Sequence, residues 1–441
     1  MPELFPYRPL TPMVEALQWT TDVVESFDGG EHRRAVRAIP RQTWEWRVVV
    51  EDQRHLSLLR GQATGAFYAP AWQEAVVTTA TIASGAGTID VDTTTGEWRD
   101  RVLLWLSPTY CETVAIASIT ATEITLDGVT SQAYAAGATV APVRTARLSS
   151  SVAVSDTRDF AILELTWTIM DAAALTAYTQ PVTYGGVEVF LDSVLLDGDF
   201  VDRDSTTPLE LLDYGTGVIE PIARYEEGRW TMPRARLRYT GRQDAWNLKR
   251  WLYRLQGRYR GFMMGSCKRE VTIKAAFAAV DTEITIDRID FALMEQTERV
   301  LLFQRHGSSY PIIREVVDAT VVDATTETLT LDSALGIAGG IHTFPAIYWL
   351  LTCRLDADRV ELSWEAPDQL EVELPVREAT YSPAYEPPTF WTTFGHGALL
   401  PQPPEEIEIS TTDVLDDKEM HIEDEIELSF TTEVFDDGAP P

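Results

Sequence analysis

The stretch LSLLRGQATGAFYAPAW (56–72) returns in altered form as LYRLQGRYRGFMMGSC (252–267). Four leucine and glycine positions match at a constant offset of 196 (252 minus 56): Leu56, Leu59, Gly61 and Gly65 match Leu252, Leu255, Gly257 and Gly261. One inserted residue, Ala66, then brings Phe67 into line with Phe262. The same local pattern therefore occurs twice in one chain.

Two further blocks recur in the same order. DRVLLW (100–105) is followed by ERVLLF (298–303), and TEITLD (122–127) by TLTLD (328–332). Shared apolar residues alone would not preserve this order over so long a stretch. We infer a duplicated domain of about 200 residues, well above the period of about 20–50 residues that marks short solenoid repeats.

The sequence around these blocks is a series of short strand patterns. TWEWRVVV (43–50) and FAILELTWTI (160–169) occur in the first copy, and AIYWLLTCRL (346–355) and LEVELPV (370–376) in the second. Runs rich in β-branched and aromatic residues favour strands. Turn residues separate the runs about every 8–12 residues, as in a β-sandwich or β-barrel.

Each copy also contains one helical pattern. EDQRHLSLLR (51–60) begins with acids and stops at Gly61, and RQDAWNLKRWLYRLQG (242–257) is its longer counterpart. Four apolar residues of the second segment fall on one helical face: Ala245, Leu248, Leu252 and Leu255. A helix ending at Gly257 is predicted there.

The predicted fold is mainly β, with two tandem copies of a β-barrel or sandwich domain, each with one helix, and an acidic C-terminal arm. The expected boundaries are 1–178 for the first copy, 179–378 for the second, and 379–441 for a Pro-rich connector and the arm. Residues 405–434 alternate acids with apolar side chains. This alternation favours an extended arm that adds a strand to a neighbour's sheet, with a disordered tail as the alternative.

The net charge is −32, from 36 Lys and Arg against 68 Asp and Glu. A surface of this sign repels nucleic acid, so specific DNA or RNA binding is not expected. No stretch of about 18 uncharged apolar residues occurs, and membrane insertion is not expected either. The three cysteines, an odd number without CxxC spacing, indicate packed free thiols.

No catalytic signature is present. The sequence has no GxSxG, HExxH or P-loop motif, so an enzyme and a bound cofactor are not predicted. The loop LDGDFVDRD (196–204) contains Asp197, Asp199 and Asp202, which are weak candidates for a calcium site. A solvated turn is the plainer interpretation of these acids.

Several segments resemble the tail-tip proteins of long non-contractile-tailed bacteriophages and gene transfer agents, in particular distal tail (baseplate) and minor tail proteins. The resemblance lies in TTDVVESFDGGEHRRAVRAIPRQTWEWRV (20–48), in GAFYAPAW (65–72), in LLDYGTGVIEP (211–221) and in RARLRYTGRQDAW (234–246). It implies a structural virion protein that forms a ring at the distal end of the tail and connects the tail tube to the receptor-binding tip.

The resemblance also implies partners: the tail tube protein, the tape measure protein and the tail hub or central fibre proteins. A homo-oligomeric ring is expected, with three chains presenting six similar domains, or with six chains as the alternative. The residues expected to matter for assembly are those of the repeat signature: Gly61, Gly65, Phe67, Gly257, Gly261 and Phe262. A carbohydrate-binding or carbohydrate-cleaving tail protein remains the alternative, because 13 tryptophans and many acids could serve a glycan site.

Overall fold

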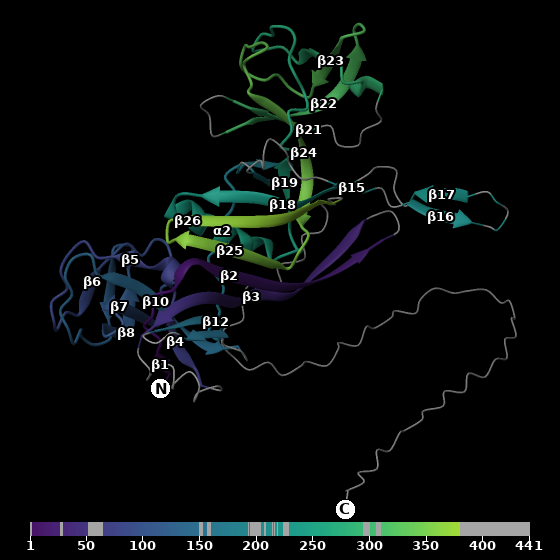
Figure 1. The fold of residues 1–441 in the computed structure, drawn as a ribbon. Helices are drawn as coiled ribbons and strands as arrows, with labels where there is room; N and C mark the ends of the chain where they lie inside the picture. Colours follow the sequence, from purple (N-terminus) through teal and green to yellow (C-terminus); the bar gives the residue numbers. More distant parts are fainter. Residues whose placement is uncertain are drawn as a thin grey trace, which may run out of the picture. The chain divides into compact units, whose positions relative to one another are not determined.

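The computed structural model is mainly β, as the sequence predicts (Figure 1). It describes residues 2–26, 30–51, 65–149, 153–156, 160–192, 194, 204–206, 209–213, 215, 217, 219–223, 229–293, 300–305 and 310–379. The described residues of both predicted copies belong to one compact unit, Met1–Tyr385. The boundary at 178 stays a prediction, and the arm of residues 380–441 lies outside the described residues.

The centre of this unit is a run of eight strands in which every neighbouring pair is antiparallel. In spatial order they are β11 (Ala153–Asp156), β12 (Ala161–Ile169), β3 (Glu31–Val50), β2 (Leu10–Glu25), β25 (Arg359–Ala366), β26 (Gln369–Glu378), β18 (Arg229–Tyr239) and β15 (Asp204–Thr206). The first four come from the first copy and the last four from the second. The pairing of β2 with β25 therefore makes one sheet out of two copies.

A second set of strands packs on this sheet in both copies. In the first copy, β1 (Glu3–Leu4) pairs parallel with β4 (Phe67–Pro70), and β4 pairs with β10 (Thr139–Leu148), which reaches β12. The second copy repeats every pairing with β14 (Val187–Phe190), β19 (Gly261–Gly265), β24 (Ala346–Leu355) and β26. The duplication inferred from the sequence thus extends to strand connectivity.

Each copy carries an inserted group of short strands with a small core of its own. The first group contains β5 (Val76–Val77), β6 (Thr88–Asp90), β7 (Arg101–Ser107), β8 (Tyr110–Ile119) and β9 (Glu123–Leu126). The second contains β20 (Glu283–Asp287), β21 (Val300–Gln304), β22 (Ile312–Val321) and β23 (Thr326–Leu331). Two 3-10 turns, η1 (Trp72–Glu74) and η2 (Phe291–Leu293), and two hairpin pairs, β13 (Thr183–Tyr184) with β14 and β16 (Leu209–Asp213) with β17 (Ile219–Ala223), complete the described elements.

The helix of the second copy, α2 (Arg242–Leu255), confirms the predicted segment. Its four predicted apolar positions are all buried: Ala245, Leu248, Leu252 and Leu255. Gln256 takes a left-handed conformation and Gly257 follows with φ 67°, which ends the helix. The corresponding helix predicted at 51–60 falls almost entirely on residues outside the described ranges.

The strand register allows the sequence repeats to be checked residue by residue. Phe67 lies opposite Ala146, and Phe262 lies opposite Cys353, in equivalent strands. This agrees with the match of the two phenylalanines.

The match of DRVLLW with ERVLLF is wrong by one residue. Val102 and Leu104 enter the small core of the first inserted group, and Leu301 and Phe303 enter that of the second. Val102 therefore corresponds to Leu301, not to Val300. Both alignments match apolar residues with apolar residues. They differ only in which side chains enter the core of the inserted group.

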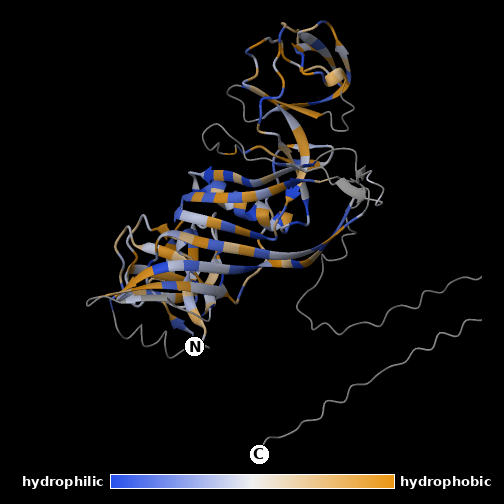
Figure 2. Cartoon of the chain, turned by 45° about the vertical axis from the view of Figure 1, so that its right-hand side comes forward, coloured by the Kyte–Doolittle hydropathy of each residue, from blue (hydrophilic) through white to orange (hydrophobic). Residues whose placement is uncertain are grey.

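The main core is shared by both copies and is rich in aromatic rings. Trp44 and Trp46 stack with ring centroids 5.6 Å apart, and Trp167 packs edge-on against Trp46 and Phe67. Figure 2 shows hydrophobic and hydrophilic residues alternating along the long strands, as expected for a sheet with one face on a core. The tryptophans of these strands therefore serve packing.

Replacing Trp167 by alanine should lower the free energy of unfolding by about 3–5 kcal/mol, because the ring is fully buried among other rings. Urea unfolding followed by circular dichroism measures this loss. Val317→Ala, at an exposed position of β22, is the control and should change stability by less than about 0.5 kcal/mol. Equal effects of the two substitutions would contradict this view of the core.

Candidate functional site at the junction of the two repeats

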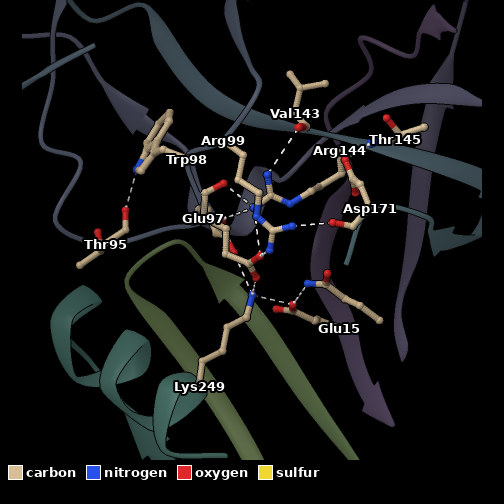
Figure 3. Close-up of polar contacts among 12 residues, drawn as sticks. Glu15, Thr95, Glu97, Trp98, Arg99, Val143, Arg144, Thr145, Asp171 and Lys249 are labelled. Atoms are coloured by element: carbon tan, nitrogen blue, oxygen red, sulfur yellow. Dashed lines mark hydrogen bonds and ion pairs between the residues drawn. The ribbon is translucent and has the colours of Figure 1, made fainter. Parts of the chain in front are cut away.

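A buried ionic cluster lies where α2 of the second copy meets the first copy (Figure 3). The side chain of Lys249 is completely buried, and its Nζ lies 2.7 Å from Glu15, 2.8 Å from Glu74 and 3.0 Å from Glu97. All three carboxylates belong to the first copy. The ammonium group therefore joins three elements of one copy to the helix of the other.

Each carboxylate reaches the cluster from a different element. Glu15 lies at a buried position on β2, the strand that pairs with β25 of the second copy. Glu74 ends η1, directly after β4, and Glu97 lies in the loop between β6 and β7. Carboxylates from three separate parts of the first copy thus meet one lysine of the second.

Three arginines complete the cluster. Arg144, almost fully buried on β10, lies 3.2 Å from the Glu97 carboxylate, and Arg99 pairs with the same group. Arg242, in the first turn of α2, donates to the main-chain oxygens of Glu74 and, at 2.6 Å, Ala75. Lys249, Arg144 and Arg99 together balance the charge of the three carboxylates, which buried ions require.

The pKa values reflect this mutual neutralisation. Burial alone would lower the pKa of Lys249, but the three carboxylates outweigh it and raise the pKa well above its ordinary value. Burial alone would raise the pKa of Glu97, but Lys249, Arg144 and Arg99 lower it to about 2. Lys249 and Glu97 are therefore both charged throughout the physiological pH range.

A second contact across the junction is made by Asp358, in the turn between β24 and β25. Its carboxylate accepts hydrogen bonds from the backbone N–H (2.7 Å) and hydroxyl (2.8 Å) of Thr21, and from the backbone N–H of Arg258 (3.0 Å). Gly257 lies beneath it: a Cβ there would be 2.5 Å from the Asp358 carboxylate. A glycine is needed both for this close approach and for the positive φ.

The predicted repeat signature therefore divides into residues with different roles. Gly257 permits the junction contact, Gly261 begins β19, and Phe67 and Phe262 are buried core residues. Gly65 precedes β4. Gly61 and the calcium candidates Asp197, Asp199 and Asp202 lie outside the described residues.

The cluster itself was not predicted from the sequence. Lys249 is one of only four lysines, and its helical neighbours three and four residues away are Ala245, Trp246, Leu252 and Tyr253, all of them buried. Its position on the apolar face of the α2 pattern is the one local signal that the sequence offers. Glu15, Glu74 and Glu97 are three of 68 acids and carry no local signal. The pairing depends on how two copies pack, which no short pattern encodes.

The arrangement suits structural cohesion better than catalysis. An amine nucleophile must be deprotonated and accessible, whereas Lys249 is enclosed and held protonated. Within the described ranges, no group of three or more His, Cys, Asp or Glu side chains is arranged to hold a metal ion. None of the helices in those ranges combines the length and the apolar character that crossing a bilayer requires. Compared with known proteins, the chain matches no protein-family model and no curated protein.

Lys249→Met should lower the free energy of unfolding by about 3–5 kcal/mol, because it leaves buried carboxylates without their counter-ion. Lys274→Met is the control, since Lys274 pairs with Asp287 on the surface and should contribute less than about 1 kcal/mol. Urea unfolding at neutral pH measures both. Adding Glu74→Gln to Lys249→Met should restore part of the loss; no recovery would mean that packing, not charge, is responsible.

Acid should weaken the junction in a defined pH window. The pKa of Glu97 is lowered from its ordinary value of 4.5 to about 2. Its contribution to the free energy of unfolding is therefore complete above pH 4.5 and is lost as the pH falls toward 2. Urea midpoints measured between pH 7 and pH 2 should decline in this window. Glu97→Gln should decline less steeply there, and an unchanged slope would assign the acid sensitivity to other carboxylates.

Proposed function

We propose that the protein is a structural component of a bacteriophage tail tip, where it forms a ring that connects the tail tube to the receptor-binding tip. The observation that carries this proposal is the edge-to-edge union of two copies of one β unit in a continuous sheet through β2 and β25. A ring of identical units is built from one repeated head-to-tail contact, and pairing between strand edges is a contact of this kind. The resemblance of residues 20–48 and 234–246 to tail-tip proteins supplies the biological setting.

The buried cluster supports a structural role. Lys249 and its three carboxylates fix the second copy on the first, and the side chain of Lys249 is fully enclosed there. A rigid pair of domains is a suitable building block for a ring. Three such chains would present six similar domains, and six chains remain the alternative.

The charge is compatible with passage of DNA. With a net charge of −32, the surface repels a polyanion, and a ring through which DNA slides must not bind it. The expected neighbours are the tail tube, tape measure and hub or central fibre proteins. The acidic arm of 379–441 is proposed to contact one of them.

The described structure gives the carbohydrate-binding alternative no specific support. Of the tryptophans that the structure describes, only Trp230 is exposed, and the remainder are buried or partly buried. Sugar-binding platforms need accessible aromatic faces, so these tryptophans do not favour one.

The protein should be present in purified phage particles, which mass spectrometry of their proteins can establish. Phage lacking the gene should produce tailless or tipless particles in electron micrographs, and a plasmid copy should restore normal tails. Normal, infectious particles without the protein would contradict the proposal. Polysaccharide cleavage by the purified protein would move the assignment to the carbohydrate-active alternative.

A further inference from the structure

The two ends of the eight-strand sheet are repeat equivalents of the two strands that pair at its centre. β11 follows β10, and both strands pair with β12. In the same way β25 follows β24, and both pair with β26. β15 and β2 each flank the equivalent strands β18 and β3. The sheet thus begins with the counterpart of β25 and ends with the counterpart of β2.

The central pair and the end strands differ in their partners. β25 pairs with both β26 and β2, and β2 pairs with both β3 and β25. Among the described residues, β11 pairs with β12 alone and β15 pairs with β18 alone. Strand edges of this kind are templates for pairing with another chain.

We propose that β11 of one chain pairs antiparallel with β15 of a second copy of this chain, as β25 pairs with β2 within the chain. This inference rests on the proposed ring and names the surface through which its chains join. Because the two edges differ, the contact is head to tail, and it closes into a ring if the rotation between copies allows.

The duplicated framework predicts the register of this contact. In the first copy Ala16 lies opposite Thr43, and in the second Asp204 lies opposite Thr231, at equivalent points of β3 and β18. Asp204 therefore corresponds to Ala16, whose partner on β25 is Glu361.

The partner of Asp204 follows from the other edge. Ile169 and Glu378 are equivalent, because they pair with Ala146 and Cys353, the partners of the two matched phenylalanines. Counting back along β12 and β26 makes Leu163 equivalent to Val372, and their partners Val154 and Leu362 equivalent as well. Ala153 then corresponds to Glu361. Asp204 of one chain is expected to face Ala153 of the next.

The contact between chains would differ chemically from the junction within the chain. By the offset of the repeat, the counterpart of Lys249 is Gln53, and that of Glu74 is Arg269. The buried ionic cluster has therefore no copy at the second junction. An unassembled chain consequently does not have to expose such a cluster, and Lys249 of α2 has its three carboxylate partners only in the first copy.

Paired cysteines test the register directly, since a disulfide requires Cα atoms within about 7 Å. The full-length protein carrying Asp204→Cys and Ala153→Cys is oxidised and compared with Asp204→Cys and Ser155→Cys, which is displaced by two residues along β11. Ala16→Cys with Glu361→Cys is the positive control, because these residues face each other in the equivalent β2–β25 pair within the chain. It shows whether cysteines at such a position form a disulfide. The protein with only its native thiols, Cys111, Cys267 and Cys353, gives the background.

The first pair should give covalent dimers and larger species that end at a closed ring, whereas the displaced pair should give background levels. The Ala16 and Glu361 pair should cross-link without a change in chain number. Absence of interchain disulfides while native mass spectrometry shows an oligomer would overturn the edge pairing and leave the proposed ring standing. A protein that stays monomeric at all concentrations would also overturn the inference, whereas the proposed function is judged separately by presence in particles.

Discussion

The arrangement of the whole compact unit depends on one buried ammonium group. Lys249 is fully enclosed, and it can be so only because Glu15, Glu74 and Glu97 surround it. Removing these charges from water costs several kcal/mol for each ion, which the mutual attraction must offset. Because of this cost, burial of Lys249 is favourable only where all three carboxylates surround it. The position of α2 on the first copy is thereby specified. The β2–β25 pairing and the α2 contact therefore belong to one junction.

The mainly β character and the duplication could be predicted from the sequence, because both are written in local patterns. The apolar face of α2 is a clear case: Ala245 and Leu252 fall on one side at helical spacing, and both are buried. The phenylalanines at 67 and 262 mark the same strand position in the two copies. Such features need only neighbouring residues to be recognised.

The junction could not be predicted, for a physical reason. Patterns of period 2 and 3.6 distinguish apolar from polar faces, and they assign every charged residue to solvent. Lys249 and Glu15 violate that rule, because each is neutralised by a group more than 200 residues away. The pairing of β2 with β25 has the same origin. It joins the free edges of two strands from different copies, and no local sequence pattern shows which edges will meet.

The two copies have the same strand pairings but different residues at the surfaces where they meet a neighbour. Strand pairings around β4 and β19 are identical, while the residues at the ionic cluster are not repeated: Glu74 corresponds to Arg269. Duplication within one chain permits this, since the two copies always meet in equal numbers and in a fixed order. Each surface can then specialise for a single neighbour.

The pairing of β2 with β25 also has a consequence for synthesis. The ribosome makes β2 at residues 10–25 and β25 only at residues 359–366. At about 5–20 residues per second, β2 waits for tens of seconds with its edge uncovered. An inward-pointing charge on an edge strand discourages pairing with other chains. During that interval Glu15 has no lysine beside it, and its uncompensated charge is expected to disfavour pairing of the β2 edge with other chains.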